Sequence, residues 1–168
     1  KLDDYLGTAS AGHVADARRL IDAARRAAQG DRLRYGEPLG VETLAKTLSD
    51  EIQETTQYGG TRPFGAALLI GGVDDTETNP RPRLFQTDPS GAPQEWRAVA
   101  IGSGRDDLQE FLEEHWSEDL SLAEGTATAV RALLETDDEL DAENVSVATV
   151  TTDGYRQVSN EDVSEIIA

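Results

Sequence analysis

The order of the expected secondary-structure elements indicates an α+β fold in which two β-sheets lie between layers of helices. The sequence predicts a strand, two helices, a block of strands, two further helices, a strand pair and a terminal helix. Helices that arrive in pairs around mainly antiparallel strands are typical of domains in which sheets bury a face under helices. We therefore expect a four-layer α-β-β-α sandwich, built as a single domain over residues 1–168.

The first strand and the two helices after it follow from hydrophobic periodicity. Residues 5–10 read as a short strand, and a helical pattern begins at Gly12 and is expected to end or fray near Gly30. A connector over residues 35–40 leads to a second helix, so the two helices should lie side by side over one sheet face. Spacings of three and four predict the buried stripes, which consist of Val14, Ala17, Leu20, Ile21 and Ala24, and of Val41, Leu44, Ala45, Leu48 and Ile52.

Four arginines of the first helix fall mostly outside its apolar stripe. They are Arg18, Arg19, Arg25 and Arg26. We interpret them as a solvated helix face with local ion pairs to Asp16 and Asp22.

Residues 53–72 predict a helix end, a glycine break and a buried strand. Gly59 and Gly60 can take the left-handed conformation that closes a helix. Pro63 cannot donate to a strand ladder, so it suits the first residue of a strand. The run over residues 64–73 is almost wholly apolar, as expected for a strand that is covered on both faces.

The second half of the chain continues with strands and capped helices. A polar loop over residues 74–82 precedes strands at 83–87 and 95–101, which a turn at 88–91 joins. The next helix should bury Leu108, Phe111 and Leu112. Ser121 and Glu124 form a capping box for a helix whose inward residues are Leu122, Ala129, Val130, Leu133 and Leu134. A hairpin at 145–158 and a helix capped by Ser159 or Asn160 complete the chain.

The charge balance excludes several function classes. With 33 acidic and 15 basic residues, the formal charge of −18 should repel nucleic acid and anionic membranes. An acidic surface with only two lysines suggests a halophilic archaeal cytoplasm, where salt screens the self-repulsion. The absence of cysteine excludes disulfides and thiolate chemistry. The sequence contains neither a signal-peptide core nor a membrane-length apolar run.

Five motifs occur in a fixed order along nearly the whole chain. Four of them are residues 3–5 leading to 12–18, then 35–38, 88–91 and 100–105; the fifth consists of Tyr58, Gly59, Gly60, Arg62, Pro63, Phe64 and Gly65. In this order and spacing they resemble archaeal proteasome α-subunits. The acidic, lysine-poor composition narrows this expectation to haloarchaeal ones. The resemblance implies the sandwich of N-terminal-nucleophile hydrolases. Because the sequence opens on Lys1, we expect the N-terminal helix and first strands of that fold to be lacking, which would expose sheet edges and reduce solubility.

The resemblance also implies a function and partners. Such α-subunits are non-catalytic: they form a homo-heptameric outer ring of the proteasome core, cap the catalytic β-subunits and gate substrate entry in intracellular protein degradation. Regulatory AAA ATPases dock their C-terminal tails between α-subunits. Gly12 matches a glycine of that pocket, and His13 stands where an apolar residue is common. For Gly12, a plain helix-start turn that needs no Cβ is an equally good explanation.

An active enzyme of the same fold is the alternative. A threonine peptidase or amidohydrolase of this kind needs an N-terminal threonine whose own amine serves as the base. The sequence opens on Lys1, and residues 58–65 are typical of the non-catalytic subunits, so we expect no catalytic residue. A threonine at the mature N-terminus would favour the alternative.

No metal or cofactor is expected. His13 and His115 are the only histidines, and neither has neighbours at ligand spacing. The glycine turn at residues 102–104 weakly suggests a nucleotide-binding loop. It lacks the third glycine of a dinucleotide fingerprint, and the two aspartates after it would compete with phosphate.

Overall fold

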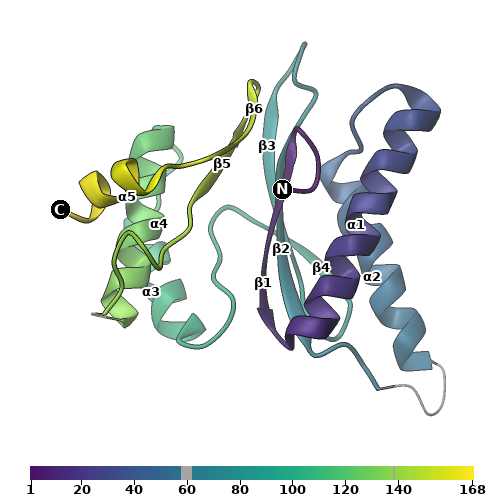
Figure 1. Ribbon diagram of the computed structural model, residues 1–168, viewed down its shortest axis with the longest axis horizontal. Coiled ribbons are helices and arrows are strands. Elements are labelled where there is room, and N and C mark those ends of the chain that lie inside the picture. Colours follow the sequence, from purple (N-terminus) through teal and green to yellow (C-terminus); the bar gives the residue numbers. More distant parts are fainter. Residues whose placement is uncertain (58–61, 138) are drawn as a thin grey trace. The chain divides into compact units, whose positions relative to one another are not determined.

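A four-stranded antiparallel sheet organises the N-terminal part of the chain (Figure 1). The computed structural model describes residues 1–57, 62–137 and 139–168. Adjacent strands follow one another in sequence, in the order β1 (Leu6–Gly12), β2 (Ala66–Asp74), β3 (Arg81–Thr87) and β4 (Pro93–Trp96). The β1–β2 register runs from Leu6 opposite Gly72 to Gly12 opposite Ala66. This sheet belongs to a compact unit formed by Lys1–Arg97 and Val150–Tyr155.

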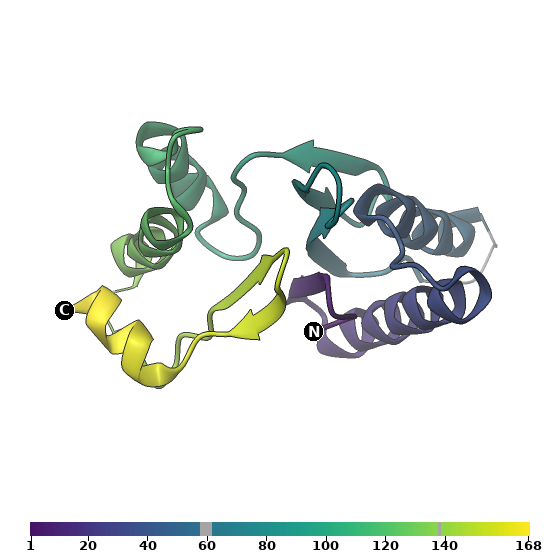
Figure 2. The same cartoon turned by 90° about the horizontal axis from the view of Figure 1, so that it is seen from above.

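Helices α1 (Val14–Tyr35) and α2 (Val41–Gln57) lie side by side on one face of this sheet (Figure 2). Their stripes meet the strands in one core. Its members are Leu20, Ala24 and Ala28 from α1, Val41, Leu44, Ala45, Leu48 and Ile52 from α2, and Leu6, Leu68, Ile70 and Phe85 from the strands. The predicted pairing of the two helices is therefore confirmed. Val14 is an exception, because its side chain is 71% exposed and lies outside the stripe.

Helix α1 does not end at Gly30, as the sequence suggested. It continues to Tyr35 and stops at Gly36, which has φ +73° and donates its N–H to the Arg32 carbonyl at 2.8 Å. A glycine inside a helix costs about 1 kcal/mol relative to alanine. Contacts on both sides of Gly30 offset that cost, since Ala28 is fully buried and Arg32 pairs with Asp3 at 3.2 Å.

Several predicted strand boundaries differ from the structure, and two of these differences have a tertiary cause. Strand β2 begins at Ala66 rather than at Pro63, and β4 ends at Trp96 rather than continuing to residue 101. At the second boundary, the Ala100 N–H donates to Oε1 of Gln109 at 3.3 Å, and Ala100 packs with Leu108. The backbone of Ala100 is therefore engaged with a helix and cannot extend the ladder.

The second compact unit, Ala98–Thr149 with Arg156–Ala168, is mainly helical. It contains α3 (Arg105–His115), α4 (Leu122–Thr136) and α5 (Asn160–Ile167). The capping box at the start of α4 is confirmed, with the Glu124 N–H donating to Ser121 Oγ at 3.3 Å. Ser159, rather than Asn160, caps α5.

The predicted inward face of α4 is only partly right. Val130 is buried as expected, whereas Leu122 and Leu133 are 57% and 38% exposed. Ala132 is buried in their place and packs with Leu108 of α3. The expected hairpin is present as β5 (Ala148–Thr151) and β6 (Gly154–Gln157), with Gly154 at φ +109°.

The described residues thus combine five helices with antiparallel strands, which confirms the α+β class. Within the part of the chain that the structure describes, no helix is both long and apolar enough to cross a lipid bilayer.

Truncation of a central core side chain should test the packing of α2 on the sheet. Leu48 is 1% exposed, so Leu48→Ala should lower the free energy of unfolding by about 2–5 kcal/mol. Urea unfolding in molar KCl, followed by circular dichroism, measures this change. Leu122→Ala is the matched control, because that side chain is mostly exposed and its loss should change the free energy by about 0.5 kcal/mol or less. Equal losses in the two variants would contradict the core assignment.

Candidate functional site

A buried carboxylate ties the start of α1 to the segment before β2. Asp16 is 7% exposed, and its Oδ1 accepts a hydrogen bond from Nη2 of Arg62 at 2.9 Å. Its Oδ2 accepts the Gly65 N–H at 2.9 Å and lies 2.9 Å from Nη1 of Arg62. The Gly65 amide, followed by the Arg62 guanidinium, lowers the pKa of the Asp16 carboxyl below its usual value. We call these three residues the Asp16 clamp.

The clamp explains why β2 starts late and corrects the expected role of Asp16. The sequence suggested a local ion pair between Asp16 and an arginine of α1, but its partner is Arg62, 46 residues away. Because the Gly65 N–H is bound to Asp16 and its carbonyl accepts the His13 N–H at 2.8 Å, Gly65 joins the helix start instead of the strand ladder. The helical periodicity could have indicated that Asp16 is buried, since this acidic residue lies close to the apolar stripe of α1.

Gly12 is required by geometry at the turn between β1 and α1. Its φ is +109°, a conformation that other residues rarely adopt. A Cβ at this position would also overlap the carbonyl oxygen of Gly65. The simple-turn explanation of Gly12 is therefore sufficient for its conformation, and the turn brings Gly12 and His13 against the motif residue Gly65.

The other motif residues either lie close to this turn or fall outside the described residues. Phe64 is 3% exposed in the core, with the Arg19 guanidinium 5.2 Å from its ring centroid. Pro63 is exposed between Arg62 and Phe64. Tyr58, Gly59 and Gly60 fall outside the described residues. The structure thus brings Gly12 and His13 together with the described half of the motif.

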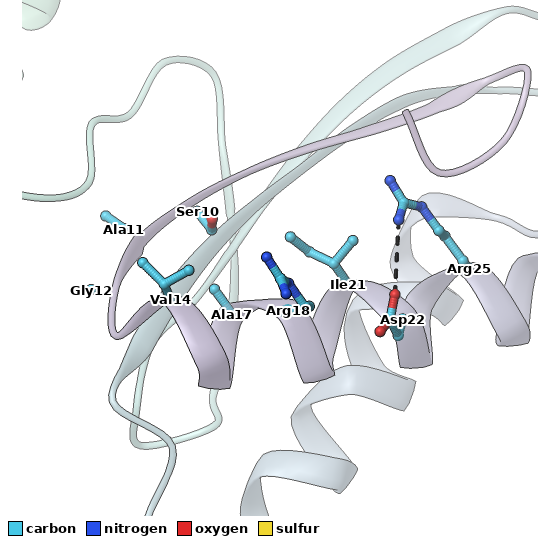
Figure 3. Close-up of a pocket in the computed structure, with 9 residues that line it drawn as sticks. All are labelled: Ser10, Ala11, Gly12, Val14, Ala17, Arg18, Ile21, Asp22 and Arg25. Atoms are coloured by element: carbon cyan, nitrogen blue, oxygen red, sulfur yellow. Dashed lines mark ion pairs between the residues drawn. The ribbon is translucent and has the colours of Figure 1, made fainter.

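A groove of about 300 Å³ runs beside this turn, between β1 and the flank of α1 (Figure 3). Val14, Arg18 and Ile21 rise from α1 toward the strand in this view. Arg25 closes the far end, with Nη1 3.8 Å from Oδ1 of Asp22. The remaining lining residues are Ser10, Ala11, Gly12 and Ala17.

The groove is lined by more positive than negative side chains. Its charged residues are Arg18, Arg25 and Asp22, and it opens beside the first turn of α1, where helix N–H groups favour negative charge. His13, the residue before α1, is exposed and makes no side-chain capping bond, so it leaves those N–H groups uncapped by its ring. Among the residues that the structure describes, no group of His, Cys, Asp or Glu side chains is arranged to hold a metal ion.

The sequence matches one protein family over most of its length. The profile of the family described as "Proteasome subunit" matches residues 1–150. "Proteasome subunit alpha 2" of Haloferax volcanii is 58% identical over the whole chain, and "Proteasome subunit alpha" of Haloquadratum walsbyi is 57% identical over the whole chain. "Proteasome subunit alpha 1" of Haloarcula marismortui is 55% identical over 96% of the chain. The chain spans 66%, 67% and 62% of the lengths of these three relatives.

Alanine substitutions at two glycines should distinguish a glycine that its backbone conformation requires from one that only lowers helix propensity. Gly12→Ala should lower the melting temperature strongly, because it combines a positive φ with a clash against the backbone of Gly65. Gly30→Ala is the matched control inside α1, where a Cβ meets nothing within 4 Å, and it should raise stability by up to about 1 kcal/mol. Thermal unfolding measures both changes. A Gly12→Ala protein as stable as the parent would show that the turn is wrongly described.

Removing the charge of Asp16 should destabilise the protein at neutral pH, and this effect should disappear in strong acid. The folded-state pKa lies below the usual value of about 3.9, so the clamp contributes stability above that value and loses it as pH falls through the folded-state pKa. Melting temperatures of the parent and Asp16→Asn should therefore differ most above about pH 5, and the difference should shrink as the pH falls below the usual carboxyl pKa of about 3.9. Asp22→Asn, which removes an exposed pair, should differ little from the parent at any pH. A difference at Asp16 that does not vary with pH would contradict the clamp.

Proposed function

Because the chain belongs to the proteasome subunit family, we propose that it is a non-catalytic α-subunit of the proteasome core. Members of this family have the proteasome-subunit fold, and the α+β elements described above agree with that fold. The observation that carries the proposal is the identity of 55–58% to proteins named proteasome subunit alpha, along 96% or more of this chain. The halophilic sources of these relatives also fit the charge of −18, and we place the protein in the cytoplasm of such a cell.

In this proposal the subunit acts by assembly. Copies form the seven-membered outer ring, catalytic β-subunits form the adjoining ring, and the outer ring controls the entry of protein substrates. The catalytic alternative, a threonine peptidase or amidohydrolase of the same fold, is not favoured, because the relatives are named as alpha subunits.

The groove beside α1 offers a docking place for the C-terminal tail of a regulatory ATPase. A tail ends in a carboxylate, and the groove combines Arg18 and Arg25 with the uncapped first turn of α1. Val14 and Ile21 supply apolar contacts for the tail's side chains. The Asp16 clamp and the Gly12 turn hold both walls of the groove at one end. The tail would therefore bind a surface that is already formed before it docks.

Reconstitution with the catalytic partner tests the proposed function. The full-length protein in molar KCl should not cleave a fluorogenic peptide by itself, and peptidase activity should appear when a haloarchaeal proteasome β-subunit is added. When a covalent inhibitor that reacts with catalytic threonine is added to this mixture, it should label only the β-subunit. Cleavage by the full-length protein alone, or labelling of its own N-terminus, would overturn the proposal.

A further inference from the structure

The negative charge of the chain is divided unequally between its two compact units. The sheet unit, Lys1–Arg97 with Val150–Tyr155, contains 16 acidic and 12 basic residues, which leaves a formal charge of −4. The helical unit, Ala98–Thr149 with Arg156–Ala168, contains 17 acidic and three basic residues, which leaves −14. The shorter unit therefore carries most of the net charge of −18.

The ion pairs of the two units differ in the same way. In the sheet unit, Arg83 is only 19% exposed and pairs with three carboxylates. In the helical unit, Arg105 pairs with Asp106 at 3.4 Å and Arg156 pairs with Asp162 at 3.6 Å, and all four of these side chains are more than half exposed. Exposed pairs of this kind contribute little to stability. Three arginines also cannot offset 17 carboxylates, so the helical unit keeps a large unbalanced charge.

Helix α3 concentrates this unbalanced charge. It exposes five carboxylates over 11 residues. Glu110 lies three or four positions from each of the other four, and like charges at these spacings destabilise a helix. Glu113 and Glu114 lie near the C-terminal end of α3, where the helix dipole also disfavours negative charge. The five residues are Asp106, Asp107, Glu110, Glu113 and Glu114.

The salt concentration sets how strongly these carboxylates repel one another. Side chains three or four residues apart on a helix are about 5–6 Å apart. The Debye length is about 3 Å at 1 M salt and about 10 Å at 0.1 M. The repulsion along α3 is therefore largely screened in molar salt and acts with little screening at the lower concentration.

The helical unit has little buried apolar surface to oppose this repulsion. Among the residues that the structure describes, its apolar cluster has three buried members, Ala100, Leu108 and Ala132, with Phe111 and Leu112 partly buried against them. The core of the sheet unit has 15 buried members in the same part of the chain. Hydrophobic stabilisation grows with the apolar area that is removed from water, so the sheet unit should tolerate a loss of screening better.

We infer that the helical unit is the salt-sensitive part of this chain. As the salt concentration falls, α3 and the α4 helix packed on it loosen first, while the sheet unit stays folded together with the Asp16 clamp and the groove beside α1. Charge and burial carry this inference, and it does not depend on the proposed function.

Two tryptophans report on the two units separately. Trp96 is the last residue of β4 in the sheet unit, and its indole Nε1 is buried. Trp116 directly follows α3 in the helical unit, and its N–H donates to the Leu112 carbonyl at 2.8 Å. Versions of the full-length protein that keep only one of these tryptophans can be made with Trp116→Phe or Trp96→Phe, and any other tryptophan of the full-length chain is replaced in the same way.

Fluorescence during a salt titration tests the inference. Each single-tryptophan protein is transferred from molar KCl to decreasing concentrations down to about 0.1 M. The emission of Trp116 should shift to longer wavelength at a severalfold higher KCl concentration than the emission of Trp96. Both proteins are measured at the same protein concentration, and circular dichroism in molar KCl establishes that each one folds.

Removing charge from α3 tests the cause of the loosening. Glu110→Gln with Glu113→Gln should move the Trp116 transition to a lower KCl concentration and leave the Trp96 transition in place. Glu51→Gln with Glu54→Gln is the matched control, because these two carboxylates are exposed on α2 at the same spacing. The control removes the same charge from the sheet unit and should not move the Trp116 transition.

Several results would overturn the inference. Transitions of the two tryptophans at the same KCl concentration would show that the chain responds to salt as one body, and an earlier transition of Trp96 would place the sensitivity in the sheet unit. A Trp116 emission that does not change down to about 0.1 M KCl would show that the charge of the helical unit is tolerated without screening. A Trp116 transition that the α3 substitutions leave in place, or that the α2 control lowers equally, would exclude the charge of α3 as the cause.

Discussion

The Asp16 clamp is the interaction on which the N-terminal half of the structure depends. One carboxylate receives the Arg62 guanidinium and the Gly65 amide, which lie 46 and 49 residues further along the chain. It thereby fixes where α1 begins, where β2 begins and how Gly12 must turn between them. A buried carboxylate is costly unless its lone pairs are satisfied, and here both oxygens are. The groove beside α1 lies next to the Asp16 clamp.

Charge is used differently inside the fold and on its surface. Arg83 lies between three carboxylates, with Glu95 at 2.7 Å, Glu42 at 3.0 Å and Asp74 at 3.6 Å, and its guanidinium is 5.0 Å from the Phe85 ring centroid. The Glu95 hydrogen bond is the main cause of the raised pKa of Arg83. Arg83 is mostly buried, whereas Glu95 and Glu42 are 48% and 41% exposed, so this network joins α2, β3 and β4 at the edge of the fold. The exposed acidic residues instead give the protein its strong net charge.

The elements that the sequence predicted well are those that local rules determine. The stripe of α2 and the Ser121 capping box depend on residues three or four apart, and both are as expected. The errors occur where a distant contact decides. Gly30 does not end α1, because Arg32 is held by Asp3, and β2 starts after Gly65, because Asp16 binds its amide.

The candidate site could be predicted only in part for the same reason. The motif and Gly12 were visible as residues, and the resemblance placed Gly12 and His13 at a pocket. That Asp16 joins Gly12 to the motif was not visible, because no short-range pattern specifies a pair separated by 46 positions. The arginines of α1 were interpreted as a solvated face, and the structure shows that only some of them have partners within the chain.

We propose that this chain acts as one member of a closed ring. Electron microscopy of the full-length protein in molar KCl tests it most directly. Class averages with seven-fold symmetry, which stack on a second ring when a β-subunit is added, are the predicted result. Particles that stay monomeric or dimeric at every concentration, with or without the β-subunit, would show that the protein does not assemble into a ring.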